Sequence, residues 1–378
     1  MAKTDGTKRS TRRSRKEHEV VLICNPQAGG RWKELAKILD SKEAKHVRRI
    51  VTDSVDDIGP ALDSLGRSAQ LVCIYGGDGT IQRLLDRMLL GKKRKVPPQI
   101  AFIGGGTMNV TATWCGFTGS PGRNFREIVR AYRSGELLLK EVPLLRIRHG
   151  ETARLGFIFG MGVPVRVLDA YEHGSKGKSA AVKMAMGAVS ALWTGFPQSF
   201  RPMLNEMSAR VTVDGAPLQY ERYVTIFCNV TGRLNPGVEP FVKQRTRDTF
   251  HYAAYATRTR ETSLMLPLLI RGIRPIDPKS LLKPVSAWRQ AYMSLRGEGS
   301  LPADPRYVND LARAVEIETT ERLYTVDGEL FDSGGEGIRV EVGPYLRLAV
   351  SSSVGLHPTV RLADEMTGGA VSGVMGQK

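Results

Sequence analysis

Three apolar segments in the first third of the sequence end in glycine-bearing turns. They are "EVVLICNPQAGG" (19–30), "QLVCIYGGDGT" (70–80) and "PQIAFIGGGTMN" (98–109). Apolar residues recur at helical spacing in "RWKELAKILDSK" (31–42) and "TIQRLLDRMLLG" (80–91). A chain that alternates buried strands and helices in this way folds into a parallel sheet covered by helices. We therefore expect an α/β domain over residues 18–140.

A different rhythm begins near residue 141 and continues to about residue 355. Short strand-like segments are separated by turn residues, as in "ARLGFIFGMG", "YVTIFCNVTG", "GIRVEVG" and "YLRLAVSSS". This pattern predicts a β-rich, sandwich-like second domain. Two helical stretches interrupt it, Lys178–Phe196 and "SLMLPLLIRGI" (263–273). Residues 356–378 are expected to return in part to the first domain or to be loose.

The three glycine turns are suited to holding phosphate groups. The carboxyl ends of parallel strands lie at one edge of a sheet, which is where ligands bind in such folds. Glycine lets the backbone approach a ligand closely, and backbone N–H groups at a helix start favour an anion. Thr80 and Thr107 can add hydroxyl groups, and Asn25 and Asn109 can add amides.

Asp78 is unexpected in such an anion site, because a carboxylate repels phosphate. Either Mg²⁺ lies between the two, or Asp78 takes a proton from an incoming nucleophile. The alternative interpretation is a helix N-cap.

A second acidic pair lies in "LYTVDGELFDSGG" (323–335), where Asp327 and Glu329 flank Gly328. "DG" is a common hairpin turn, and "TVDGAPL" (212–218) contains another. Glu329 distinguishes the later turn, because it supplies a second carboxylate. On local grounds alone, a structural turn and an acidic site both remain open.

Together these motifs resemble the diacylglycerol kinase catalytic-domain family, which includes bacterial soluble lipid kinases, sphingosine kinases and ceramide kinases. The resemblance rests on "NPQAGG", "GGDGT", "GGGTMN" and "VDGE", in this order and over residues 18–355. "GGDGT" alone is less specific, because NAD kinases and phosphofructokinases also contain it.

The resemblance implies a nucleotide-binding α/β domain, a β-rich lipid domain and an active site in the cleft between them. It implies ATP and Mg²⁺ as cofactors, with Asp78 and Glu329 near the metal. Asp327 falls where bacterial members place the catalytic carboxylate, whereas the sphingosine kinase branch assigns the base to the position of Asp78. We favour Asp327 and keep both as catalytic candidates, with Glu329 assisting. The implied nucleotide-binding residues are Asn25, Gly29, Gly30, Thr52, Gly76, Gly77, Asp78, Gly79, Thr80, Gly106, Thr107 and Asn109.

The chain departs from the family pattern at several positions. Gln82 and Arg83 replace the usual Asn-Glu after "GGDGTI", and Val110 replaces an Asp. Gly104 stands where the family has a proline.

The chain carries a net charge of +17, part of it in residues 1–17, which lack apolar periodicity and are expected to be a disordered tail. Attraction to an anionic membrane, a solvated tail and nucleic-acid binding are three interpretations of this segment. We favour the membrane and expect no nucleic-acid partner. The four cysteines show no metal or redox spacing, which is typical of buried thiols in a cytosolic protein. We expect no transmembrane helix.

These observations predict an ATP-dependent lipid kinase that is cytoplasmic and peripherally attached to the membrane. Its acceptor would be the hydroxyl of diacylglycerol, ceramide or a sphingoid base. A soluble-substrate kinase similar to NAD kinases and a non-catalytic regulator that binds nucleotide or lipid are the alternatives. The oligomeric state is left open, a homo-oligomer included.

Overall fold

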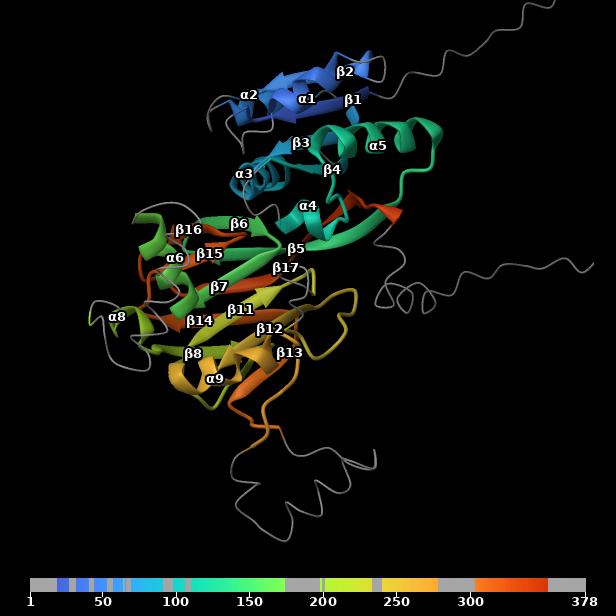
Figure 1. The fold of residues 1–378 in the computed structure, drawn as a ribbon. Coiled ribbons are helices and arrows are strands. Elements are labelled where there is room, and N and C mark those ends of the chain that lie inside the picture. Colours follow the sequence, from blue (N-terminus) through green and yellow to red (C-terminus); the bar gives the residue numbers. More distant parts are fainter. Residues whose placement is uncertain are drawn as a thin grey trace, which may run out of the picture.

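The computed structural model describes residues 19–26, 32–40, 44–52, 57–63, 65, 69–90, 98–105, 110–173, 198, 201–232, 240–277 and 303–352. Figure 1 shows an α/β domain stacked on a β-rich domain, with the helix α9 at the far end of the second domain.

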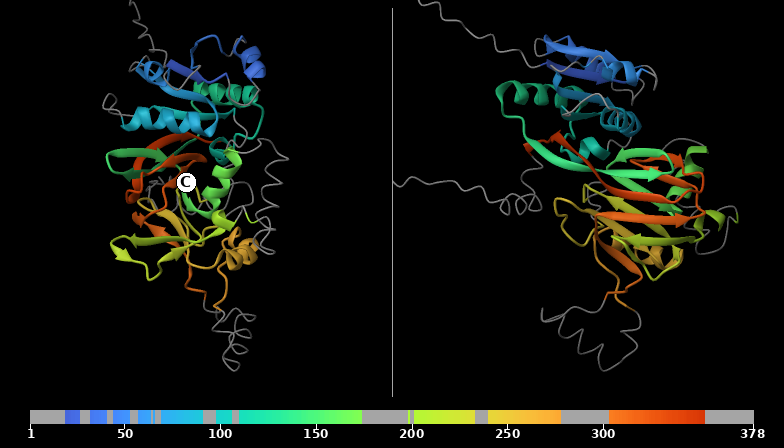
Figure 2. Two further views of the ribbon diagram at one scale, coloured as in Figure 1. Left: turned by 90° about the vertical axis from the view of Figure 1, so that its left-hand side faces the viewer. Right: turned by 180° about the vertical axis from the view of Figure 1, so that it is seen from behind.

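Four parallel strands form the sheet of the first domain, in the spatial order β4, β3, β1, β2. Both faces of this sheet carry helices, which is why β1, β3 and β4 are almost continuously apolar and buried, whereas most of the edge strand β2 is exposed. Figure 2 shows the helices on the two faces. The strands are β1 (Glu19–Cys24), β2 (Val47–Val51), β3 (Ala69–Gly76) and β4 (Gln99–Gly104), and the helices are α1 (Trp32–Leu39), α2 (Ile58–Asp63), α3 (Asp78–Leu90), α4 (Val110–Trp114) and α5 (Pro121–Ser134).

The second domain contains two layers of antiparallel strands. One layer extends the first sheet, in the order β10-β8-β14-β17-β4, with β5 paired to β17, β6 to β5 and β9 to β8. Its strands are β5 (Leu139–His149), β6 (Thr152–Gly156), β8 (Met207–Val213), β9 (Ala216–Pro217), β10 (Arg222–Tyr223), β14 (Ala314–Thr319) and β17 (Ile338–Ala349).

The other layer is a separate sheet in the order β13-β12-β11-β7-β15-β16. These strands are β7 (Ile158–Gly162), β11 (Thr225–Asn229), β12 (Phe250–Tyr255), β13 (Tyr307–Ala312), β15 (Leu323–Val326) and β16 (Glu329–Asp332), and the helices of this domain are α6 (Val163–His173), α8 (Arg201–Leu204) and α9 (Thr259–Leu269). The predicted α/β domain with a parallel sheet and the predicted β-rich second domain are both confirmed.

The long strand β17 joins the two domains. It pairs with β14 and β5 in the second domain, and its last residues run parallel to β4, with Leu348 opposite Ile100. "GIRVEVG" and "YLRLAVSSS" were expected to be two strands, and that expectation is wrong. They form this single strand, with a register shift between Val342 and Tyr345.

All four cysteines are buried thiols, as expected. Burial raises the pKa of Cys73 to about 12. Within the described residues, every helix is too short or too polar to cross a bilayer. The predicted helix at residues 178–196 and the tails 1–17 and 356–378 lie outside the described residues.

Candidate active site

The carboxyl ends of the parallel strands lie side by side, as the sequence predicts. The backbone N–H of Asn25, after β1, donates to the carbonyl of Tyr75 in β3 at 3.0 Å. The N–H of Gly105, after β4, donates to the carbonyl of Gly76 at 3.0 Å. The described parts of the three glycine turns therefore share one edge of the sheet.

Two side chains connect the turns along this edge. The Asn25 amide donates to the hydroxyl of Thr80 at 3.3 Å, which links the end of β1 to the first turn of α3. Thr52 follows β2 and is almost fully buried, and its N–H and hydroxyl both approach the carbonyl of Cys24, at 2.9 and 3.3 Å. Thr52 thus holds the ends of β1 and β2 together.

Helix α3 begins immediately after the second glycine turn. The N–H of Ile81 donates to the carbonyl of Gly77 at 3.1 Å, so Gly77 caps the helix and Asp78 is its first residue. The interpretation of Asp78 as the N-cap is therefore wrong by one position. By helix geometry, the N–H groups of the first turn have no intrahelical partner and attract anions.

Part of the predicted site lies outside the described residues. Gly29, Gly30, Gly106, Thr107 and Asn109 lie outside the described residues, as do the side chains of Asp78 and Val110.

The "VDGE" segment forms the tight hairpin between β15 and β16. Asp327 and Gly328 have φ angles of 52° and 91°, as a type I′ turn requires. One carboxylate oxygen of Asp327 accepts the backbone N–H groups of Phe157 at 2.9 Å and Ile158 at 2.8 Å. The N–H of Asp327 donates to the carbonyl of Ile158 at 3.0 Å. These bonds fix the Asp327 side chain against the start of β7.

A second hairpin in the same domain makes the same set of bonds. Asp214 and Gly215 have φ angles of 49° and 85°, and one carboxylate oxygen of Asp214 accepts N–H groups from Arg313 at 2.9 Å and Ala314 at 2.8 Å. The N–H of Asp214 also donates to the carbonyl of Ala314. The backbone clasp is therefore a structural property of both "DG" turns. Any special role of Asp327 must come from its surroundings.

Those surroundings include the start of α3. A Cβ atom placed on Gly79 would overlap the carboxylate of Glu329, so that carboxylate touches the backbone of "GGDGT". A Cβ atom on Gly156 would overlap Val326 and lie 2.8 Å from a carboxylate oxygen of Asp327. The structure thus brings "GGDGT" and "VDGE" together where the two domains meet, across 250 residues of chain.

A third contact between the domains was not predicted. The Gln82 amide donates to Asp86 at 2.6 Å, and the other carboxylate oxygen of Asp86 accepts the N–H of Leu155 at 2.6 Å. Arg154 lies 4.0 Å from the Asp86 carboxylate. The sequence offered one signal for this contact: Gln82 and Asp86 are polar residues four positions apart on a mostly apolar face of the helix. Gln82, noted as a departure from the family pattern, is therefore buried in this contact, and Arg83 is exposed.

Burial raises the pKa of the Asp86 carboxyl to about 6, against the opposing effects of the Leu155 and Gln82 hydrogen bonds and the Arg154 charge. Backbone N–H groups between Leu155 and Ile158 therefore donate hydrogen bonds to two carboxylates. One is Asp86 from the first domain and the other is Asp327 from the second.

The acids of the site are oxygen ligands of the kind that Mg²⁺ prefers. Among the described side chains no group of three or more potential metal ligands occurs. Mg²⁺ in phosphate-binding sites typically uses one or two carboxylates together with phosphate oxygens, so Glu329 at the helix start fits this chemistry.

The diacylglycerol kinase catalytic domain matches residues 19–136 as a family model. This match confirms the resemblance drawn from the motifs and supports a phosphotransferase. No protein of curated function matches the sequence.

Solved structures share the fold over most of the chain. Two diacylglycerol kinases from Bacillus anthracis str. Sterne, one assigned only provisionally, have TM-scores of 0.56 and 0.55 and sequence identities of 17% and 14%. Each comparison covers 89% of this chain and 98% of the other. Yeast NADH kinase, in complex with NADH, has a TM-score of 0.48 at 10% identity, over 94% of this chain and 90% of its own. At these identities the similarity concerns the fold alone.

Proposed function

We propose, on the premise that residues 19–136 form a diacylglycerol kinase catalytic domain, that the chain transfers the γ-phosphoryl group of ATP to a hydroxyl of a membrane lipid. The acceptor class would be diacylglycerol, ceramide or a sphingoid base.

One observation carries the proposal: the Glu329 carboxylate lies against Gly79 at the start of α3. A hairpin from the second domain thereby adds an acid to the edge of the first domain that suits phosphates. Phosphoryl transfer depends on positioning the reactants and on neutralising charge. Both require N–H groups that bind the phosphates to lie close to acidic side chains.

The ATP phosphates would lie along the glycine turns. The N–H groups of Gly79 and Thr80 face this edge at the helix start, and Asn25 holds the Thr80 hydroxyl there. The Glu329 carboxylate and a phosphate bound at the helix start would repel each other. Mg²⁺ held by Glu329 and Asp78 would offset this repulsion. When bound, the metal would neutralise charge on the phosphate oxygens.

Asp327 would accept the proton of the lipid hydroxyl. The Phe157 and Ile158 N–H groups hold its carboxylate in one orientation, so little reorganisation is needed when the acceptor arrives. A positioned general base contributes about 10²- to 10⁴-fold to the rate. Asp78 is the competing candidate for this role.

The hairpin that contains Asp214 and Gly215 supplies the control for a test of this proposal. Asp327→Asn and Asp214→Asn each remove the charge of the carboxylate but keep a side-chain oxygen that can accept the same two backbone N–H groups, so their effects on stability should be small and similar. Only Asp327→Asn should reduce phosphoryl transfer, by about 10²- to 10⁴-fold. A larger loss in Asp78→Asn would move the base to Asp78. Unchanged transfer in both Asp327→Asn and Asp78→Asn would refute the mechanism.

The acceptor can be identified with labelled ATP and a panel of substrates. Diacylglycerol, ceramide and a sphingoid base would be presented in detergent micelles, with NAD⁺ as the soluble candidate, and the products analysed by mass spectrometry. A phosphorylated lipid is the expected product. Phosphorylated NAD⁺ alone would favour the soluble-substrate alternative, and ATP binding without any product would indicate a regulator.

A further inference from the structure

Helix α9 uses only a narrow side to attach to the second domain. Leu269 is buried against Ala253, Tyr255 and Tyr307 of β12 and β13, and Met265 packs beside it. This cluster is separate from the main core. In Figure 1 the helix lies at the end of the molecule away from the α/β domain.

The rest of the helix presents large apolar side chains outward. Leu264, Leu266 and Leu268 are 57%, 52% and 37% exposed. Leu264 and Leu268 are four residues apart and share a face with Arg260 and Arg271. Soluble surfaces rarely gather large apolar groups in this way without a partner.

The turn after the helix extends the same apolar surface. Gly272 has a φ of 67°, and the N–H of Ile273 donates to the carbonyl of Leu268 at 3.1 Å. The N–H of Gly272 donates to Leu269, which completes a Schellman motif. The chain therefore reverses and brings Ile273, 49% exposed, beside Leu268. We call Arg260, Leu264, Leu268, Arg271 and Ile273 the α9 surface; Leu266, two residues from Leu264, points to another side of the helix.

Cations surround these apolar groups. Residues 258–277 contain four arginines, all exposed, and two acids. One of the acids, Glu261, already pairs with Arg306 at 2.9 Å. The local charge is therefore positive.

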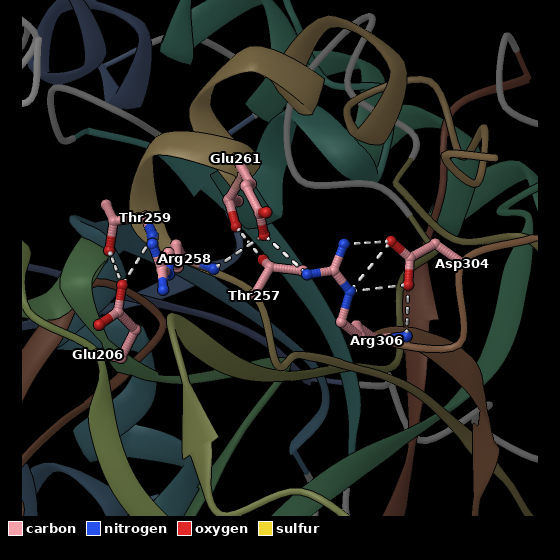
Figure 3. A network of polar contacts seen from close by, with 8 residues as sticks. Glu206, Thr257, Arg258, Thr259, Glu261, Asp304 and Arg306 are labelled. Atoms are coloured by element: carbon pink, nitrogen blue, oxygen red, sulfur yellow. Dashed lines mark hydrogen bonds and ion pairs between the residues drawn. The ribbon is translucent and has the colours of Figure 1, made fainter. Parts of the chain in front are cut away.

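A polar network fixes the start of α9 in place (Figure 3). Arg306 bonds to the buried Asp304 at 2.7 Å as well as to Glu261. The N–H of Thr259 donates to Glu206 at 2.9 Å. The hydrogen bonds to Asp304 raise the pKa of Arg306 above its ordinary value. This network therefore holds the helix that carries the exposed leucines in one position.

We propose that the α9 surface docks the protein on an anionic lipid bilayer. Apolar side chains rimmed by arginines match the interfacial region of such a membrane, where leucines enter the acyl boundary and cations meet the headgroups. A second copy of this chain fits less well, because it would bring arginines against arginines.

This inference rests on the proposed function, since a lipid kinase has to work at a membrane surface. The two can nevertheless fail separately. Docking is measured by vesicle binding, and phosphoryl transfer is measured on a lipid dispersed in detergent.

The first experiment is co-sedimentation of the full chain with vesicles. Phosphatidylcholine alone would be compared with phosphatidylcholine containing about 30 mol% phosphatidylglycerol. We expect binding to the anionic vesicles, at least about tenfold weaker in Leu264→Glu/Leu268→Glu. Leu138→Glu is the matched control, because Leu138 is 48% exposed on the segment before β5 and should leave binding unchanged. Equal binding of all three proteins would overturn the proposal.

A second experiment does not depend on how the double variant folds. The native cysteines are fully buried, so Leu264→Cys and Leu138→Cys can each be labelled selectively with an environment-sensitive dye. The label at 264 should shift to the blue on anionic vesicles, and the label at 138 should not. A concentration-dependent shift at 264 without vesicles would instead indicate a second copy on this surface and refute bilayer docking.

Should phosphoryl transfer to a detergent-dispersed lipid be absent while vesicle binding follows these expectations, the proposed function fails and the docking surface stands. Normal transfer without vesicle binding gives the reverse conclusion.

Discussion

Asp327 and Asp214 occupy equivalent turns with equivalent hydrogen bonds, and only their neighbours differ. Glu329, two residues after Asp327, reaches the backbone of Gly79 in the other domain. At the residue scale the candidate site therefore depends on glycine at position 79, because any side chain there would occupy the volume of the carboxylate.

Gly79→Ala should displace Glu329 at little cost in stability, since a carboxylate at the end of a flexible side chain can move. We expect phosphoryl transfer to fall by at least about tenfold through lost transition-state stabilisation. In a Glu329→Ala background the same substitution should have little further effect. Kinetics of the two single variants and the double variant test this coupling.

Gly337→Ala is the control, because its added Cβ would meet only the carbonyl of Ile317, at 3.7 Å. Additive losses in the double variant would show that Gly79 serves the ligand directly rather than through Glu329.

At the scale of elements, helix α3 links the glycine turns of the first domain to strand β6 of the second domain. Its first turn lies at the glycine edge of the sheet, and two turns later Asp86 bonds to Leu155 of β6. Leu155 is followed directly by the segment whose N–H groups hold Asp327. The position of α3 relative to β6 therefore determines how the glycine turns lie relative to Asp327.

Protonation of Asp86 makes this contact sensitive to pH. Burial raises its pKa from 3.8 to about 6, so the unfolded chain releases the proton at a lower pH than the folded protein does. The free energy of unfolding should therefore decrease as pH rises from about 4 to about 6, by up to about 3 kcal/mol from this group.

Asp86→Asn should abolish this contribution, and urea unfolding of the parent and the variant across that range measures the difference between them. A difference that does not change with pH would contradict the raised pKa.

Strand β17 makes the whole molecule one structural unit. It belongs to the second domain along most of its length and ends beside β4, and one apolar core contains residues of both domains. We therefore expect the described parts of the two domains to unfold together.

Leu348→Ala removes a fully buried side chain of β17 next to β4. It should destabilise the protein by about 2–5 kcal/mol. Hydrogen exchange followed by mass spectrometry, at increasing urea, should show β3 and β12 losing protection at the same concentration. Persistent protection of β12 after β3 has exchanged would mean that the domains unfold independently.

The sequence by itself determined the parallel sheet, the shared edge of its glycine turns and the "DG" hairpin. These follow from local signals, since apolar periodicity and glycine conformation act within a few residues. It also predicted α9 as a helix, but helical periodicity could not tell which side of "SLMLPLLIRGI" packs and which faces outward.

Only the tertiary structure decided that Glu329 meets Gly79, that Asp86 holds Leu155 and that β17 crosses between the domains. Each of these contacts joins residues far apart in the chain, and their formation depends on how complete sheets and helices pack. The two "DG" turns make alike backbone hydrogen bonds, and in the sequence only Glu329 distinguished the later one; that this carboxylate lies against Gly79 could not be deduced from local sequence. Packing placed one of these turns against the start of α3 and left the other on an exposed hairpin.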